Sequence, residues 1–185
     1  LELRDRLMAE LNTLREQTGS VSSQPPRPIL SEPSLPFYHT NVLTGEELRD
    51  MITPVKQLLR RDCYTRLRKY LTGSYPGRVC LLYGLRRTGK TTLLFQAITD
   101  LTEEQFDQSV YIKAAKGDTM AGLNRDLKLL RRQGYRYIFI DEVTLLEDFI
   151  DSASALSDIY AMMGMKIVLS GADSLGFWIS LFDEL

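Results

Sequence analysis

Eight consecutive residues of this chain have the types and the spacing that binding a polyphosphate requires: Gly84-Leu85-Arg86-Arg87-Thr88-Gly89-Lys90-Thr91. The two glycines let main-chain amides curl around an anion without a Cβ in the way. Lys90 offers a positive charge to the outer phosphates, and the Thr91 hydroxyl is suited to holding Mg²⁺. A helix starting here, with Thr92 in its first turn, would aim its positive end at the same anion. The pattern therefore predicts that residues 84–92 bind a nucleotide.

The sequence on either side of this loop favours the same interpretation. Residues 79–83 form a continuous apolar run, as expected of a buried parallel strand, and residues 92–98 read as a helix. A strand, a glycine-rich loop and a helix, in this order, are the context that the phosphate-binding motif (Walker A) needs. The alternative is a plain glycine turn between a strand and a helix, because short motifs also match by chance.

Two carboxylates follow an apolar strand predicted over residues 136–141. Asp141 and Glu142 end this stretch, about 50 residues after the loop. As a Walker B element, Asp141 would lie next to the phosphate loop and hold Mg²⁺ directly or through water. Glu142 would reach the water that faces the γ-phosphate and act as its base or orient it. The alternative is two acids that merely end a strand at the surface, and the distance from the loop favours the site.

A third apolar strand, predicted over residues 166–170, ends in Ser170. A polar group at this position could hydrogen-bond the attacking water or the γ-phosphate, and Ser170 is the candidate, with Asp173 and Ser174 behind it. An ordinary serine between a strand and a loop explains the residue equally well, so both interpretations stay open.

The alternation of elements predicts an α/β fold, a P-loop three-layer sandwich with a mainly parallel sheet and helices on both faces. The expected elements are strand 78–83, helix 90–101, strand 109–113, helix 119–133, strand 136–141, helix 145–163 and strand 166–170. The expected capping boxes pair Thr44 with Glu47, Thr102 with Gln105, and Thr144 with Glu147. Asp118 is the expected cap of the helix that follows it, and Gly134 and Gly164 are expected to end helices.

Four segments are predicted along the chain. An amphipathic helix over residues 1–18 precedes a linker over residues 19–42 that is rich in proline and serine. A helical segment over residues 43–74, with Pro54 as an expected kink, leads into the P-loop core over residues 75–185.

The composition limits the classes of function. The net charge of −1 gives no support to nucleic-acid binding, and the basic clusters at 60–61, 66–69 and 131–132 read as solvated helix faces. His39 is the only histidine, which argues against a zinc site or a histidine-based triad. No apolar stretch is long enough to span a membrane, and the 2 cysteines indicate no disulfide framework. An intracellular, reducing compartment is therefore expected.

Residues 84–91, 139–142 and 169–171 together resemble the AAA-type ATPases. The Gly-x-Arg-Arg-x-Gly-Lys-Thr form of the loop resembles bacterial and archaeal members in particular, and the resemblance covers residues 78–175. It implies ATP at the carboxyl edge of the sheet, with the lysine, the threonine and the two acids in the roles given above.

The same resemblance implies further elements after the last strand, namely another strand, an arginine finger and a helical lid. The core over residues 75–185 is therefore expected to be incomplete at its C-terminal end. Arg86 and Arg87 lie inside the loop and are expected to be poorly placed as the finger. A protein partner or a second copy of the chain is expected to complete the site.

Three functions remain open on the sequence. The first, favoured by Glu142, is an ATPase that uses Mg²⁺ and couples hydrolysis to a conformational change in a larger assembly. The second is a nucleotide-dependent switch or scaffold module with little hydrolysis, favoured by the N-terminal helix and linker. The third, a small-molecule kinase, is disfavoured by the adjacent acids and by the lack of an evident acceptor pocket.

Overall fold

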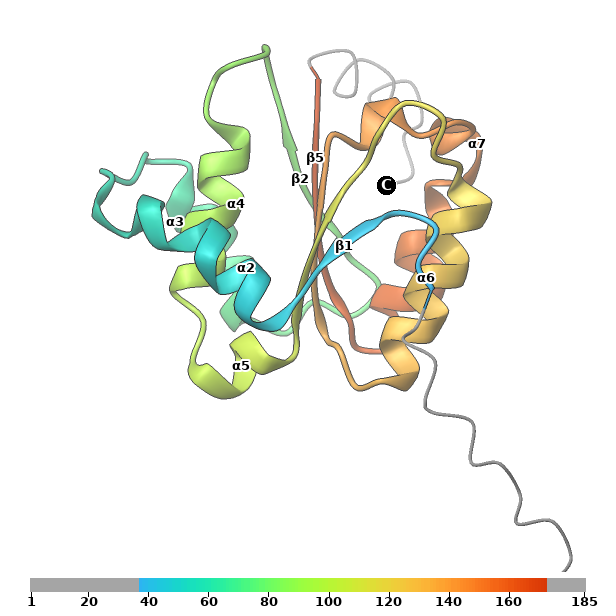
Figure 1. Cartoon of the computed structure of the whole chain (residues 1–185), viewed down its shortest axis with the longest axis horizontal. Coiled ribbons are helices and arrows are strands. Elements are labelled where there is room, and N and C mark those ends of the chain that lie inside the picture. The colour runs from blue at the N-terminus through green and yellow to red at the C-terminus, as the bar shows by residue number, and fades with distance from the viewer. Residues whose placement is uncertain (1–36, 173–185) are drawn as a thin grey trace, which may run out of the picture. The chain divides into compact units, whose positions relative to one another are not determined.

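The computed structural model describes residues 37–172, which form a five-stranded sheet with helices on both faces (Figure 1). The order across the sheet is β1-β3-β4-β5-β2. The strands are β1 (Asn41–Leu43), β2 (Cys80–Tyr83), β3 (Ser109–Lys113), β4 (Tyr137–Asp141) and β5 (Lys166–Gly171). This is the mainly parallel α/β arrangement that the sequence predicts. The helix predicted over residues 1–18 and the linker up to residue 36 lie outside the described residues.

Four of the strands run parallel, so their carboxyl ends meet at one edge of the sheet. β2 pairs with β5, β5 with β4, and β4 with β3. The register places Tyr83 opposite Gly171, and Lys113 opposite Asp141. The strand that leads into the phosphate loop and the strand that ends in Asp141 are thus separated by β5 alone.

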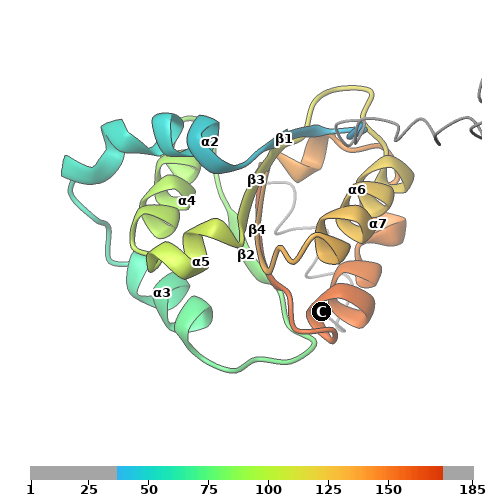
Figure 2. The ribbon, with the colours of Figure 1, turned by 60° about the horizontal axis from the view of Figure 1, so that its bottom comes forward.

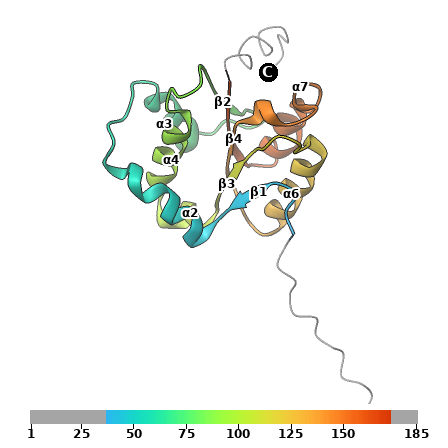
Figure 3. The ribbon, with the colours of Figure 1, turned by 45° about the horizontal axis from the view of Figure 1, so that its top comes forward.

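Two helical layers enclose the sheet, as Figures 2 and 3 show from two further directions. One layer holds α2 (Gly45–Ile52), the 3₁₀ helix η1 (Thr53–Gln57), α3 (Tyr64–Thr72), α4 (Lys90–Thr99) and α5 (Glu103–Asp107). The other holds α6 (Met120–Arg132), α7 (Phe149–Ser152) and the π-helical turn η3 (Leu156–Ala161). Within residues 37–172, no helix is both long enough and apolar enough to cross a membrane.

Alternate side chains of β3 enter the two cores, because successive residues of a strand face opposite sides of a sheet. Val110 and Ile112 pack in the cluster that contains Leu123 and Leu127 of α6. Tyr111 packs in the other cluster, with Leu94 of α4. The alternation of side chains along β3 therefore places the Tyr111 ring on the face of the sheet that α4 covers.

Strand β1 spans the boundary between the linker predicted over residues 19–42 and the helical segment predicted over residues 43–74, since it comprises Asn41–Leu43. It pairs antiparallel with β3, with Val42 opposite Ile112. The buried Asp126 carboxylate on α6 holds the preceding turn, because it accepts hydrogen bonds from the amide of His39 (2.9 Å) and the amide and hydroxyl of Thr40 (2.8 and 2.7 Å). These long-range hydrogen bonds hold residues 39 and 40 in place, in a segment whose composition predicts an extended linker.

The single helix predicted over residues 145–163 is wrong. The structure has three short pieces instead: η2 (Val143–Leu145), α7 and η3. Asp148 takes a left-handed backbone conformation (φ 58°) between the first two pieces, which a continuous helix does not allow. Thr144 does not cap a helix here, because its hydroxyl accepts a hydrogen bond from the Ala172 amide (3.4 Å).

Of the other predicted helix ends, some are confirmed and others are wrong. The Thr102–Gln105 capping box is confirmed, with both of its hydrogen bonds present. Gly134 and Gly164 follow helices with positive φ (97° and 86°), as expected. Thr44 makes no side-chain capping bond, so its predicted box with Glu47 is wrong. The residue that caps α6 is Thr119 and not Asp118, whose carboxylate accepts from the Ala115 amide instead (2.8 Å).

Candidate functional site

The phosphate loop connects β2 to α4 through a backbone that only some residues adopt easily. Gly84 and Gly89 have φ of 151° and 82°, in the range that favours glycine. Arg87, between them, also has a positive φ (63°). The helix α4 begins at Lys90, directly after Gly89, so its unpaired amides face the loop. The predicted strand, glycine loop and helix are therefore all present.

The Lys90 ammonium group lies within this loop. Its Nζ atom donates to the carbonyl oxygens of Gly84 and Leu85, each at 2.8 Å. The Thr88 hydroxyl donates to the Leu85 carbonyl as well (2.8 Å), which closes the loop on itself. The positive charge is thus held among the main-chain groups that a polyphosphate would contact.

The Asp141 carboxylate joins the loop to the strand ends. It is 2% exposed, and Oδ2 accepts from the Thr91 hydroxyl at 2.7 Å and from the Tyr111 hydroxyl at 2.8 Å. Oδ1 accepts from the Glu142 amide at 3.1 Å and from the Ser170 hydroxyl. Four donors from α4, β3, β5 and the residue after β4 therefore surround one carboxylate.

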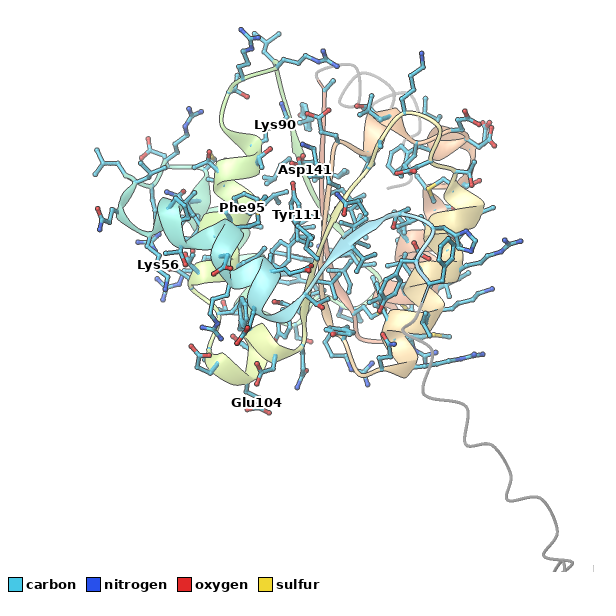
Figure 4. All side chains as sticks on the ribbon, viewed as in Figure 1. Lys56, Lys90, Phe95, Glu104, Tyr111 and Asp141 are labelled. Carbon is cyan, nitrogen blue, oxygen red and sulfur yellow. The ribbon has the colours of Figure 1, made fainter. Side chains whose placement is uncertain are left out.

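Tyr111 is a member of the site that sequence reasoning missed. Burial, and then the nearby Asp141 carboxylate, raise the pKa of its phenol well above the ordinary value, so the hydroxyl keeps its proton and donates. Figure 4 shows Tyr111 directly beneath Asp141, with Phe95 of α4 beside it and Lys90 above. A tyrosine within an apolar strand is typical of a core residue. Only the register between β3 and β4 could have indicated its contact with Asp141.

Ser170 lies beneath the site and not in its wall. It is fully buried, and its hydroxyl donates to Asp141. The Glu142 amide also points at its Oγ atom (3.4 Å). Its predicted contact with water or phosphate stays a prediction, whereas the structure shows it bracing the carboxylate. Asp173 and Ser174, predicted to lie behind it, are outside the described residues.

A cavity of about 700 Å³ opens at this edge of the sheet. Its lining includes Arg86, Arg87, Gly89, Lys90, Thr91, Thr92, Asp141, Glu142, Thr144, Gly171 and Ala172. That volume lies within the usual range for small-molecule sites, roughly 300–1,000 Å³. Both arginines of the loop line the same cavity as Glu142. That they are poorly placed as an arginine finger stays a prediction.

Arg61 is the second residue that sequence reasoning missed, since its cluster read as a solvated face. Its guanidinium lies against the phosphate loop, with one nitrogen 3.3 Å from where a Cβ on Gly89 would stand. It lines a smaller hollow of about 220 Å³ together with Leu58, Leu59 and Gly89. The loop therefore contacts the cavity of about 700 Å³ and also the segment before α3.

The oxygen atoms at the centre of the site fit Mg²⁺. This ion prefers oxygen ligands and usually combines one or two carboxylates with water and phosphate oxygens. The Thr91 hydroxyl and the Asp141 carboxylate are 2.7 Å apart and supply such oxygens next to the loop. Since Asp141 already accepts from four protein donors, its carboxylate is suited to orient the Thr91 hydroxyl, whose oxygen would ligate the metal.

A phosphate-binding loop that opens a helix, with an acidic strand end beside it, defines a P-loop nucleotide-binding fold. Residues 76–178 match the AAA domain family, and this chain belongs to that family. It is therefore a nucleotide-binding ATPase module. No curated protein matches the chain.

The fold resembles that of a larger protein of known structure. The matching chain comes from a closed-state cryo-EM reconstruction of Hsp104 with ATPγS and FITC casein, with a TM-score of 0.54 and 18% sequence identity. The match covers 77% of this chain and 27% of that chain. At this identity the likeness shows a shared fold.

Proposed function

We propose that this protein binds ATP with Mg²⁺ in the 700 Å³ cavity and hydrolyses it to drive a conformational change. The observation that carries the proposal is the 2.7 Å hydrogen bond between Thr91 and Asp141, residues 50 positions apart. It brings the Walker A loop and the Walker B strand end together, as metal-assisted phosphoryl transfer requires.

The predicted phosphate-binding, metal-binding and proton-accepting residues have roles that their positions support, whereas Ser170 is buried against Asp141. Lys90 and the amides of residues 84–91 bind the phosphates, and Thr91 with Asp141 would hold Mg²⁺, which neutralises phosphate charge when bound. Glu142 lines the cavity beside them and would take a proton from the attacking water. The water oxygen bonds to the γ-phosphorus, the bond to the β–γ bridging oxygen breaks, and ADP and phosphate leave.

Residues 58–64, which precede the P-loop core, are hydrogen-bonded to the helix that follows the phosphate loop, and this contact would let them respond to bound nucleotide. The Gln96 side chain of α4 donates to the Leu58 carbonyl (3.0 Å). Asp100, just after the same helix, accepts hydrogen bonds from Arg60 and Tyr64. A shift of α4 would therefore move residues 58–64, and a protein partner or a second copy of this chain is the proposed receiver of that motion.

The test is phosphate release by wild-type protein and by Glu142→Gln, with Glu147→Gln as the matched control. Glu147 is an exposed glutamate five residues further on and outside the cavity lining. Glu142→Gln is expected to keep ATP binding and to slow turnover by about 10²–10⁴-fold, the usual worth of a positioned proton acceptor. The control should match wild type.

The alternative function, a nucleotide-dependent switch with little hydrolysis, gives a different result. Wild-type protein would then bind ATP and release phosphate no faster than Glu142→Gln. Lys90→Ala identifies the site in either case, because it removes the charge held in the loop and is expected to weaken ATP binding. Transfer of the γ-phosphate to a metabolite instead of water would favour the kinase alternative.

A further inference from the structure

The Tyr111 hydroxyl and the Thr91 hydroxyl share one acceptor. Both donate to Oδ2 of Asp141, at 2.8 and 2.7 Å. Thr91 belongs to α4, which follows β2, and Tyr111 belongs to β3. In the sheet, β3 and β2 lie on opposite sides of β4, the strand that ends in Asp141. The torsion that turns a carboxylate about its last bond is soft, so its donors decide which way the oxygens face.

The Tyr111 ring has little freedom to move. The residue is 1% exposed and lies in the core cluster that includes Leu94 and Val168. Its ring packs against Phe95, with centroids 4.9 Å apart and planes tilted by 58°. Phe95 sits one and a half turns along the helix that begins at Lys90, so the ring is clamped by the same helix that binds the phosphates.

Three other tyrosines of the described region are buried, and the Tyr64 hydroxyl, like that of Tyr111, donates to a carboxylate, that of Asp100. The other two donate to main-chain carbonyls. Tyr160 donates to the main-chain carbonyl of Asn124 (2.9 Å), and Tyr70 to that of Arg78 (2.8 Å). Those bonds anchor loops and helices to each other. The Tyr111 hydroxyl instead ends on the side chain through which the two nucleotide-binding motifs meet.

We propose that Tyr111 is a positioning residue that holds the Asp141 carboxylate turned toward Thr91 and so sets the affinity of the site for the metal–nucleotide complex. The inference rests on the proposed function, because it concerns the same site. Loss of the hydroxyl leaves Oδ2 with one donor in place of two and sets an apolar ring edge against a buried carboxylate. The carboxylate then has less reason to keep the orientation in which Oδ2 accepts from Thr91.

The test compares Tyr111→Phe with Tyr160→Phe, which removes a hydroxyl bond of similar length far from the site. Calorimetry measures ATP affinity with Mg²⁺ and with EDTA, and the ratio of the two gives the metal-dependent gain. Titration of Mn²⁺ into the ATP complex, followed by electron paramagnetic resonance, reads the metal directly.

Tyr111→Phe is expected to lower the metal-dependent gain by about 10–100-fold, as found when partners that orient metal ligands are removed. Its affinity for ATP in EDTA should stay close to that of wild type, because Asp141 contacts the phosphate loop through the Thr91 hydroxyl and not through Lys90, whose ammonium group is held by the Gly84 and Leu85 carbonyls. Tyr160→Phe should leave both quantities unchanged. An equal loss with and without metal would show a merely structural role and overturn the inference.

Two further outcomes separate the inference from the proposed function. A wild-type protein that is folded but gains nothing from Mg²⁺ would overturn both. A wild-type gain that Tyr111→Phe preserves would overturn the inference alone. Should Tyr111→Phe fail to fold, Phe95→Leu loosens the ring and keeps the hydroxyl, and it is expected to reduce the metal-dependent gain in the same direction; an unchanged gain in that variant would also contradict the inference.

Discussion

Replacing Arg87 by glycine is expected to stabilise the protein while weakening its nucleotide site. Arg87 has φ of 63°, a conformation that costs an ordinary residue roughly 1–2 kcal/mol and costs glycine little. A residue held in such a conformation at a functional site points to a side chain that is needed there. Arg87 lines the cavity together with Glu142 and Lys90, so its guanidinium group could contact a bound nucleotide.

The net effect on stability follows from two opposing contributions. Relief of the left-handed conformation contributes roughly 1–2 kcal/mol, and the greater freedom of glycine in the unfolded chain offsets about 0.5–1 kcal/mol of it. The variant should therefore be more stable by up to about 1.5 kcal/mol, and by about 0.75 kcal/mol at the middle of both ranges. In a chain of 185 residues this raises Tm by about 1–4 °C.

Arg87→Ala separates the strain from the charge. Alanine keeps the cost of the left-handed conformation, so this variant should show no gain in Tm, while both variants lose the guanidinium group. Both should bind ATP a few-fold more weakly, because an exposed charge pair is worth about 0.2–1 kcal/mol. Asp148→Gly, at another positive φ (58°) outside the cavity lining, is the control for stability and should bind ATP normally.

Differential scanning calorimetry on the four proteins, with and without ATP and Mg²⁺, measures both effects. Equal stability of the glycine and alanine variants would refute the reasoning from backbone strain. Unchanged ATP affinity in both variants would remove Arg87 from the site.

Two further predictions concern the core. Burial raises the pKa of the Cys80 thiol from near 9.0 to about 11, so the folded state keeps its proton to higher pH than the unfolded chain does. This contribution to stability is complete below pH 9 and declines above it, by about 1.4 kcal/mol at pH 10. Burial also raises the pKa of Tyr64 and Tyr70 to about 12, so these phenols add to the decline. Urea unfolding at pH 8 and 10 should therefore show a decline that is smaller by about 1.4 kcal/mol in Cys80→Ala than in wild type. Asp126→Ala leaves the buried amide and hydroxyl of Thr40 and the partly buried amide of His39 without an acceptor. It should cost about 2–5 kcal/mol in the same assay, against about 1 kcal/mol for Thr40→Val. A loss under about 1 kcal/mol for Asp126→Ala would contradict the anchoring role.

The phosphate loop and the strand ends could be predicted because their signals are local. Apolar runs fix the strands, and parallel strands bring their carboxyl ends to one edge. The Thr91–Asp141 contact follows from these two facts, since a short loop leaves Thr91 little choice of position. The roles of Lys90 and Glu142 in chemistry remain predictions that the geometry supports.

Other parts depend on contacts between distant residues. Strand β1 has only three residues next to a segment rich in proline, and an aspartate 86 positions away holds its entry. The break after residue 145 carries no glycine or proline, since Asp148 supplies the left-handed turn. A sequence pattern that reads neighbours alone does not contain such information.

The site residues that were missed share the same cause. Tyr111 reaches Asp141 because the strand register turns it toward α4. Arg61 reaches Gly89 because the segment before α3 folds back over the loop. In both cases the sequence gives the residue type, but the residue that it contacts in the fold is distant in the sequence.

The most direct measurement is an anomalous difference map of crystals grown with ATPγS and Mn²⁺. The account predicts one strong manganese peak at the Thr91 hydroxyl, on the side of Asp141, with the triphosphate wrapped by residues 84–91. A nucleotide bound elsewhere on a folded chain, or a metal peak remote from both side chains, would contradict it.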